Sequence, residues 1–406
     1  MSYYKLININ KQFHNDMLNI NFNNYDEHYD DNDINNKLFI CHNLEKYLRM
    51  MKYQIFLNHN QWDNIKKYTN PYEFIHTNIP KNKFSISKYK PISRAFFKLL
   101  EIFNTFKILK YYDNIKSIST FHLAEGPGGF LEATAYLRKN KDDKYHGITL
   151  IDNNNICVPG WKKSEMLLNK YKNINILKGV NNKGDLFNHL NLDYCYKHHK
   201  SSMHIITGDG GFDFSVNYGK QEVNAIRLIL TQVFYAIIMQ KPNGHFILKI
   251  FDIFYKSTVD VIYMLSLFYN EVHIIKPNTS RHANSEKYIV CKFFKNINVN
   301  IFIDKFKWVL TVLNNTDLKK FYIHSILDIK YQHIYLSKLI EINTILGQQQ
   351  LDCISITIKT ILFKDKYIEN FKLTQKHNIE KCINWCIKHN IEYNKEPIPM
   401  NIFLNR

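Results

Sequence analysis

The sequence is short of acidic residues. It has 36 Asp and Glu against 54 Lys and Arg in 406 residues, a formal net charge of +18 and a pI of about 9.3. Such an excess of positive charge indicates a polyanionic partner, most simply nucleic acid, or else an acidic surface. Asn, Ile, Lys and Tyr are abundant, however, and a gene rich in A and T would raise the lysine content without any function.

Long hydrophobic runs and paired cysteines are also missing. No uninterrupted apolar run reaches the roughly 18 residues of a membrane span, and no signal-peptide pattern opens the sequence. The seven cysteines are scattered and odd in number, which argues against a disulfide framework and fits a reducing compartment. We therefore expect a soluble intracellular protein with no membrane partner.

The length and the apolar content suggest several domains. A chain of 406 residues has the length of two or three domains, and 45% hydrophobic and 15% aromatic residues can supply sizeable cores. We predict an N-terminal helical or irregular extension over residues 1–85, an α/β domain over 86–296 and a helical C-terminal region over 297–406.

The most informative stretch is Thr120–Glu132. An apolar run ends at Glu125, the turn Gly126, Pro127, Gly128, Gly129 and Phe130 follows, and a helical pattern begins. A parallel strand passes to a helix in this way beside nucleotide-like ligands, because glycine lets the backbone approach them. On its own the pattern is equally that of an ordinary strand-to-helix turn.

Strand and helix patterns alternate after this turn. Acidic residues follow four of the expected strands: Glu125, Asp152, Asp185 and Asp209. The alternation predicts a mostly parallel, Rossmann-like sheet covered by helices on both faces, with Val272–Ile275 and Tyr288–Phe294 forming an antiparallel hairpin. Ligands bind at the carboxyl ends of the strands in such sheets, so the four acids are candidate site residues.

The flanking regions show fewer signals. Tyr25–Asn36 reads as a loop and Leu44–Phe56 as a helix, while Ser93, Asn60 and Asn70 are possible helix starts. Helices are expected over Asp317–Leu346, Leu351–Phe371 and Gln375–His389, with breaks at Gly347 and Asn378 and no strand. We assign no metal site to Cys382, Cys386 and His389, because no second ligand group accompanies them. His198 and His199 read as a solvated loop.

Five segments in order carry a family resemblance. They are Ser93–Lys98 (SRAFFK), Glu125–Phe130 (EGPGGF), Gly208–Asp213 (GDGGFD), Phe246–Lys249 (FILK) and Lys276–Val290 (KPNTSRHANSEKYIV). Over about residues 90–295 the chain resembles the FtsJ/RrmJ-type RNA ribose 2′-O-methyltransferases. The amino-acid sequences of the two glycine-rich segments most resemble those of the mRNA cap-specific branch, including versions from large cytoplasmic DNA viruses.

The resemblance implies a site, a cofactor and a partner. The catalytic Lys-Asp-Lys-Glu tetrad of the family would fall on Lys98, Asp209, Lys249 and Glu286. S-adenosylmethionine would bind Glu125, Gly126, Pro127, Gly128, Gly129 and Phe130, with Asp152, Asp185 and Asp209 as further contacts. The loop Asn153–Asn155 departs from many members, which puts the Asp152 contact in doubt. Capped mRNA would be the substrate, and other capping enzymes are possible partners.

The chemistry of the residues agrees with this resemblance. A ribose 2′-hydroxyl is a poor nucleophile, so transfer of a methyl group needs positioning and a base. A lysine can be the base where burial and a second cation lower its pKa. We assign Lys249 as the base and let Lys98 help to hold the ribose, with Asp209 and Glu286 orienting both ammonium groups.

Three functions remain open at this point. The first is a cap 2′-O-methyltransferase that converts cap-0 to cap-1, the second a ribosomal or transfer RNA 2′-O-methyltransferase, and the third an inactive RNA-binding subunit. The intact tetrad argues against the third. A viral enzyme would be expected in the cytoplasm, in a viral factory or virion, and a cellular one in the nucleus.

Overall fold

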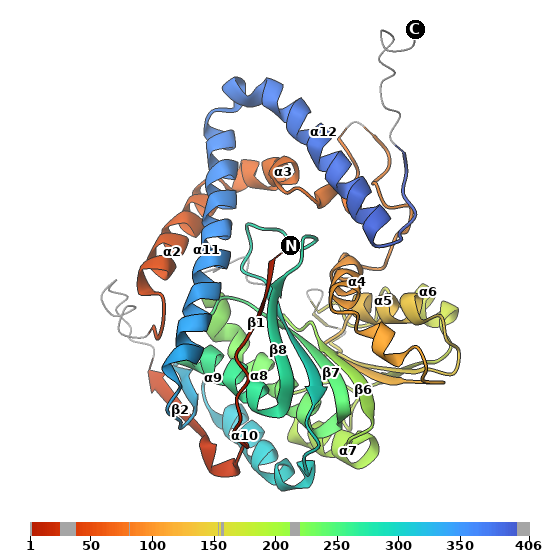
Figure 1. Ribbon diagram of the computed structural model, residues 1–406, viewed down its shortest axis with the longest axis vertical. Helices are drawn as coiled ribbons and strands as arrows, with labels where there is room; N and C mark the ends of the chain where they lie inside the picture. Colours follow the sequence, from red (N-terminus) through yellow and green to blue (C-terminus); the bar gives the residue numbers. More distant parts are fainter. Residues whose placement is uncertain are drawn as a thin grey trace.

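An eight-stranded sheet forms the centre of the molecule (Figure 1). The computed structural model describes residues 2–24, 38–80, 82–152, 154–155, 158–211 and 220–395. The loop expected over Tyr25–Asn36 and the last two residues of the Gly208–Asp213 segment lie outside these residues.

The sheet has the order β1-β8-β9-β7-β6-β3-β4-β5. Strands β7, β6, β3, β4 and β5 are parallel, whereas β9 is antiparallel to both β7 and β8. The expected mostly parallel fold, with its final strand reversed, is confirmed. The strands are β1 (Ser2–Lys5), β3 (Ser119–Leu123), β4 (Lys144–Ile148), β5 (Ile174–Leu177), β6 (Met203–Gly208), β7 (Gln240–Ile250), β8 (Tyr269–Lys276) and β9 (Lys287–Phe294).

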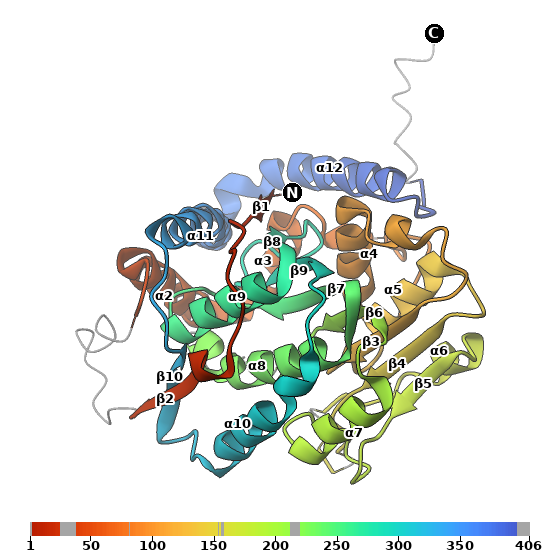
Figure 2. The same cartoon turned by 60° about the horizontal axis from the view of Figure 1, so that its bottom comes forward.

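Helices cover both faces of this sheet (Figure 2). One face packs against α4 (Ala95–Phe106), α5 (Gly129–Arg138) and α6 (Glu165–Lys170). The other face packs against α7 (His189–His199), α8 (Gln221–Met239), α9 (Lys256–Phe268) and α10 (Ile303–Asn315). Helix α8 has the length and apolar composition of a membrane span, but most of it is buried in this core.

The N-terminal and C-terminal extensions pack against each other. Helices α2 (His42–Leu57) and α3 (His59–Thr69) contact α11 (His333–Leu362), and α12 (Lys364–Lys388) contacts α3 and the short helix η2 (Glu73–Ile75). Strand β2 (Leu18–Asn24) pairs with β10 (Phe321–Leu327) in a second, two-stranded sheet. Short 3₁₀ helices cover Asn15–Met17, Leu109–Tyr112 and Val299–Ile301. The extensions therefore form a joint structure rather than two separate appendages.

Several local predictions in the extensions are wrong. The segment expected to be helical from Asp317 contains β10, because the edge of β2 satisfies its backbone groups and its alternate side chains reach the core. Gly347 lies inside α11 and Asn378 inside α12, rather than at breaks. A Cβ atom at Gly347 would come within 2.6 Å of Leu44 Cδ2, so the glycine lets α2 approach α11 closely.

Five smaller differences also appear. Strand β1 joins the sheet by pairing with β8. Ser93 does not cap α4 with its side chain, Asn60 lies inside α3, and Asn70 ends α3 instead of starting a helix. His199 lies at the end of α7, half-buried against Phe121 and His146, and not in a solvated loop.

A buried ion triad anchors α2 to the sheet. Asp252, just after β7, accepts hydrogen bonds from Lys52 on α2 at 2.7 Å and from Lys287 on β9 at 3.3 Å. Burial raises the pKa of Asp252, but the two lysine charges more than reverse this and bring the pKa to about 2. Because the carboxyl group titrates near 3.9 in an unfolded chain, its contribution to stability is complete above pH 4 and is lost as the pH falls through 2.

We expect Asp252→Asn to lower the free energy of unfolding at pH 7 by about 3 kcal/mol, because both lysines lose their buried counter-charge. The difference from the wild type should shrink between pH 4 and pH 2. Urea unfolding at a series of pH values measures both effects. Asp304→Asn is the control, since the Asp304 side chain is 91% exposed. If the difference in unfolding free energy between the variant and the wild type did not change with pH, the lowered pKa of Asp252 would not contribute to stability.

Candidate active site

The glycine turn begins where β3 ends, and Glu125 organises it. One carboxylate oxygen of Glu125, Oε1, accepts hydrogen bonds from the backbone N–H groups of Phe130 at 2.7 Å and Leu131 at 2.8 Å. The other, Oε2, is buried and has no partner in the part of the chain that the structure describes. Burial raises the pKa of Glu125 well above its usual range. Glu125 thus caps α5 and still presents one free acceptor.

Close backbone contacts determine the shape of the turn. Gly128 has a φ of +115°, which side chains rarely tolerate. A Cβ on Gly126 would lie 2.5 Å from the carbonyl oxygen of Gly160, and one on Gly129 would lie 2.2 Å from Ser93 Oγ. The glycines therefore let the turn contact both the loop after β4 and the start of α4.

Asp152 and Asp185 lie in two neighbouring loops beyond β4 and β5. Ile151 N–H donates to the carbonyl of Lys183 at 2.7 Å, which joins these loops. Each carboxylate accepts a local backbone hydrogen bond: Asp152 from Asn154 at 3.0 Å and Asp185 from Phe187 at 2.9 Å. Both acids lie where the sequence predicted them, beyond the strand ends, but outside the hydrogen-bond network described next.

The four residues of the expected tetrad come together at the carboxyl ends of β6 and β7. Lys98 Nζ on α4 lies 2.7 Å and 2.9 Å from the two carboxylate oxygens of Glu286. Lys249 Nζ on β7 donates to the carbonyl oxygen of Asp209 at 2.6 Å and lies 3.3 Å from Asp209 Oδ1. All four side chains are mostly buried, so the site presents two cations and two carboxylates largely out of water.

Tyr288 connects the two ion pairs, and sequence reasoning missed it. Its hydroxyl lies 2.9 Å from Asp209 Oδ1 and 3.3 Å from Glu286 Oε1. Residues two apart in a strand share a face, and Tyr288 pairs with Lys249 in the β7–β9 register. The Glu286–Tyr288 spacing could have indicated this role. The hydroxyl carries one proton, so it donates to one carboxylate at a time.

Comparison with known proteins supports a family assignment. The model of the FtsJ-like methyltransferase family matches residues 91–294, half of the chain. The chain belongs to the FtsJ-like methyltransferases. All four tetrad residues, the glycine turn and Tyr288 lie inside the matched region.

Three curated relatives of this FtsJ-like domain are each named cap-specific mRNA (nucleoside-2'-O-)-methyltransferase 1. The Drosophila melanogaster protein is 34% identical over 175 residues, 42% of this chain and 21% of that protein. The Caenorhabditis elegans protein is 29% identical over 213 residues, which is 50% of this chain and 23% of that protein. The Homo sapiens protein is 33% identical over 179 residues, which is 42% of this chain and 21% of that protein. The match thus spans about a fifth to a quarter of the length of these relatives.

A ribosomal RNA methyltransferase from Plasmodium falciparum is among the similar solved structures. It is 23% identical with a TM-score of 0.35, and the match covers 50% of this chain and 97% of that one.

The loop Pro277–Glu286 of the FtsJ-like domain is held from several sides. Lys276 Nζ, fully buried, donates to the carbonyl oxygens of Asn284 at 2.6 Å and Glu286 at 2.7 Å. Ser280 Oγ donates to Glu286 Oε1 at 2.9 Å. Asn284 Oδ1 is a third acceptor for the Lys276 ammonium group. Burial lowers the pKa of Lys276 well below its usual range, so all three oxygen acceptors are needed to stabilise a charge there. The loop therefore presents Glu286 to Lys98 in one orientation.

Two carboxylates outside the tetrad hold the outer part of this loop. Glu101 on α4 accepts from the backbone N–H groups of Asn278 at 3.0 Å and Thr279 at 3.1 Å. Glu73, a fully buried residue of η2, pairs with Arg281 through hydrogen bonds of 2.6 Å and 3.0 Å. The loop is thus tied both to the helix that carries Lys98 and to the N-terminal extension.

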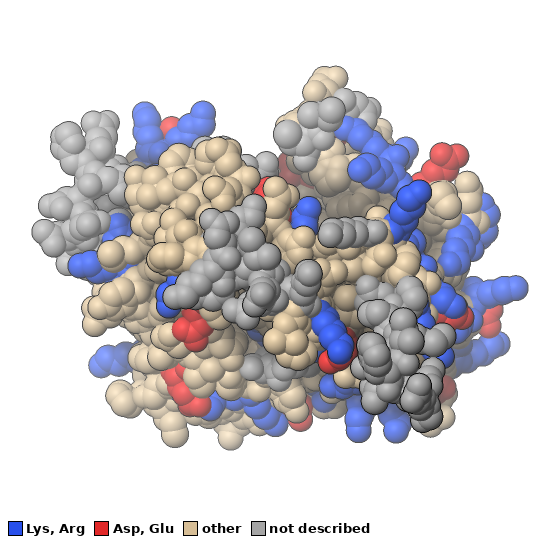
Figure 3. Space-filling view, turned by 90° about the horizontal axis from the view of Figure 1, so that it is seen from above, with Lys and Arg blue, Asp and Glu red and all other residues tan. Residues whose placement is uncertain are grey.

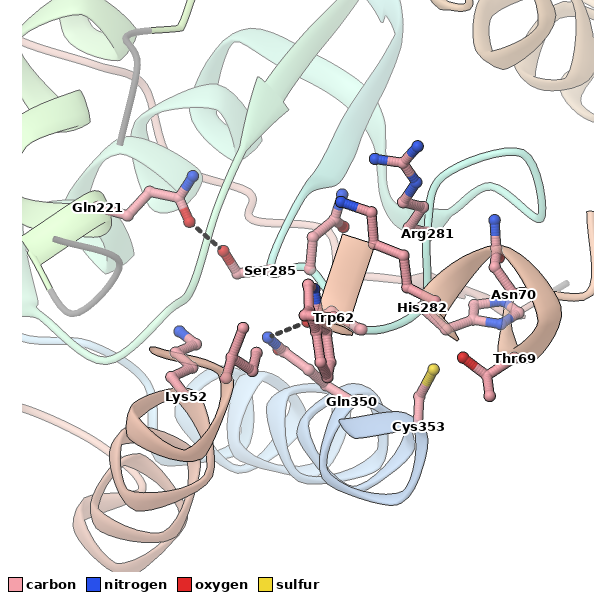
Figure 4. A pocket seen from close by; sticks show the side chains of 14 residues that line it. Lys52, Trp62, Thr69, Asn70, Gln221, Arg281, His282, Ser285, Gln350 and Cys353 are labelled. Atoms are coloured by element: carbon pink, nitrogen blue, oxygen red, sulfur yellow. Dashed lines mark hydrogen bonds between the residues drawn. The ribbon is translucent and has the colours of Figure 1, made fainter. Parts of the chain in front are cut away.

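A cavity of about 200 Å³ opens beside the end of this loop (Figure 4). Trp62 from α3, Lys52 from α2 and Gln350 from α11 line it together with Gln221 and Ser285. Ser285 precedes Glu286 in the chain, and its Oγ donates to Gln221 Oε1 at 2.5 Å. The extensions therefore complete a hollow beside the segment that leads into Glu286.

We expect Glu101→Gln to loosen the loop without unfolding the protein. The amide cannot accept at both oxygen positions, and a hydrogen bond to a charged group contributes about 1.5–3 kcal/mol. Hydrogen exchange of the Asn278 and Thr279 amides should therefore become at least about tenfold faster. Thr105→Val is the control: Thr105 Oγ1 donates to the backbone carbonyl of Glu101, and its replacement leaves the Glu101 carboxylate in place. Unchanged exchange would show that Glu101 does not hold the loop.

Proposed function

We propose that this protein is an S-adenosylmethionine-dependent mRNA cap 2′-O-methyltransferase. It would methylate the ribose 2′-hydroxyl of the first transcribed nucleotide and convert cap-0 to cap-1. The observation that carries the proposal is the buried network of Lys98, Glu286, Tyr288, Asp209 and Lys249 at the carboxyl ends of the strands. The names of the curated relatives support a capped mRNA substrate.

Lys249 is the proposed base for the 2′-hydroxyl proton. Among the described residues, its Nζ donates to the carbonyl oxygen of Asp209 at 2.6 Å and lies 3.3 Å from the Asp209 carboxylate. These partners orient the amine. Gly211 lacks a side chain that would crowd Lys249: a Cβ there would lie 3.1 Å from Nζ.

Lys98 is the proposed fixed cation of the site. Burial lowers its pKa, but both Glu286 oxygens lie within 2.9 Å and favour the charged ammonium group. A charged Lys98 can hold the ribose oxygen. The two lysines thus take different roles because their anionic partners lie at different distances.

The glycine turn fits the proposed methyl donor. S-adenosylmethionine supplies an activated methyl group on a sulfonium. Glu125 Oε2 is a buried carboxyl oxygen without a partner among the described residues, and a Cβ atom on Gly126, Gly128 or Gly129 would lie within 3 Å of another protein atom. These residues would hold the donor, with Asp152 and Asp185 in the adjoining loops. The cavity beside Ser285 is the candidate place for the cap guanine, because it combines Trp62 with side-chain amides.

We expect Lys249→Ala to abolish methyl transfer and to leave donor affinity nearly unchanged. Lys249→Arg should not rescue activity, because arginine stays protonated. An active Lys249→Arg enzyme would leave Lys249 only a positioning role.

The substrate is tested in the same assay. Labelled S-adenosylmethionine is incubated with capped RNA, the same RNA uncapped, and ribosomal RNA. Methylation of capped RNA alone is expected. Methylation of ribosomal RNA in preference would favour the second candidate function, and no transfer to any RNA would favour an inactive RNA-binding subunit.

Gly128→Val should weaken S-adenosylmethionine binding at least about tenfold in calorimetry. Valine cannot readily adopt a φ of +115°, and its Cβ would lie 2.7 Å from Leu167 Cδ2. Lys249→Ala is the matched control that keeps the turn. Thermal unfolding establishes whether each variant is folded. Full donor affinity in a folded Gly128→Val protein would place the donor elsewhere.

A further inference from the structure

A groove runs between α12, α4 and β1, and its inner end adjoins the cavity beside Ser285 through Thr69, His282 and Cys353. It consists of two hollows of about 430 and 720 Å³ that share Tyr72, Asn278 and Lys381. We call it the α12 groove. Tyr72, Lys381 and the rest of α12 lie outside residues 91–294, so the family match does not include this wall.

One wall of the α12 groove is a polar helix face. Lys381, Asn384 and Lys388 line it and are all exposed. Their spacing of three and four residues places them on the same side of α12. Opposite them lie Asn104 on α4 and Tyr3 on β1, whose side chain is 53% exposed. The groove thus combines cations, amides and an accessible aromatic ring.

The charge of the groove is positive and uncompensated. Among the described residues that line it, Asp352 is the one carboxylate, and it belongs to the smaller hollow. Lys381 and Lys388 have no ion-pair partner in the described part of the chain, in contrast to Lys52 and Lys98. Lys and Arg predominate over Asp and Glu on the face seen in Figure 3. A polyanion would meet little repulsion here.

The groove is continuous with elements that build the tetrad. Helix α4 carries both Lys98 and Asn104, and six residues correspond to about 9 Å along a helix. Asn278 lines both hollows, and its backbone N–H is bound by Glu101 of the same helix. A chain in the groove would therefore lie within a few nucleotides of the tetrad.

We propose that the α12 groove binds single-stranded RNA downstream of the methylated nucleotide. Lys381 and Lys388 would contact phosphates, and Tyr3 and Tyr72 would stack on bases, the combination that proteins use for single strands without sequence preference. The inference rests on the proposed function for the identity of the ligand. The α12 groove would be a second RNA-contact region, which a long RNA reaches and a short cap-proximal fragment does not.

The test compares RNA length in the full-length protein. Fluorescence anisotropy measures the affinity of the double variant Lys381→Gln, Lys388→Gln for capped RNAs of about 4 and about 20 nucleotides. The longer RNA should bind at least about tenfold more weakly than it binds the wild type. The slope of log affinity against log salt should fall by about 1.4, because each lost phosphate contact to a single strand removes about 0.7. The short RNA should bind as before.

The matched control is Lys319→Gln, Lys320→Gln, which makes the same charge change at two exposed residues away from the groove. Equal affinity of the groove variant and the control for the long RNA would overturn the proposal, as would an equal loss for both RNA lengths. Methyl transfer by the wild type separates the two hypotheses: if no RNA is methylated but the length-dependent loss remains, the proposed activity fails and the RNA groove stands.

Discussion

The buried carboxylate of Glu286 is the constraint on which the site depends. Burial alone would raise its pKa, but the charges of Lys98 and Lys249, with Arg94 nearby, hold the pKa well below its usual range. The same carboxylate offsets the cost of burying Lys98. The charges of Lys98 and Glu286 are both largely out of water. Neither side chain can move far without leaving the other charge uncompensated, and this constraint determines the geometry of the site.

The position of Glu286 in turn depends on residues outside the FtsJ-like match. The loop that carries it is bound at its base by Lys276 and at its middle by Glu101, both within the matched region. Its outer part is bound by Glu73 through Arg281, and Glu73 belongs to the N-terminal extension. Helix α12 packs on η2 from the other side. The extensions thus stabilise the loop as well as lining the hollows beside it.

Sequence patterns predicted well where local signals and tertiary contacts agree. Apolar runs followed by acids located the parallel strands, because strands buried on both faces read as continuous hydrophobic segments. Prediction failed where a distant partner decides the state of a segment. Strand β10 exists because β2, some 300 residues earlier, offers it an edge, and Gly347 stays helical because Leu44 occupies the space beside it.

The sequence by itself determined the fold class and the glycine turn, since each has a local signal, while its resemblance to the FtsJ-like family predicted the candidate residues Lys98, Asp209, Lys249 and Glu286. Only the tertiary structure decided that Tyr288 joins the two ion pairs, that the two extensions pack together, and that a basic groove lies under α12. These features depend on which side chains meet across long stretches of chain. Local periodicity reports how a segment folds but not which partner it finds.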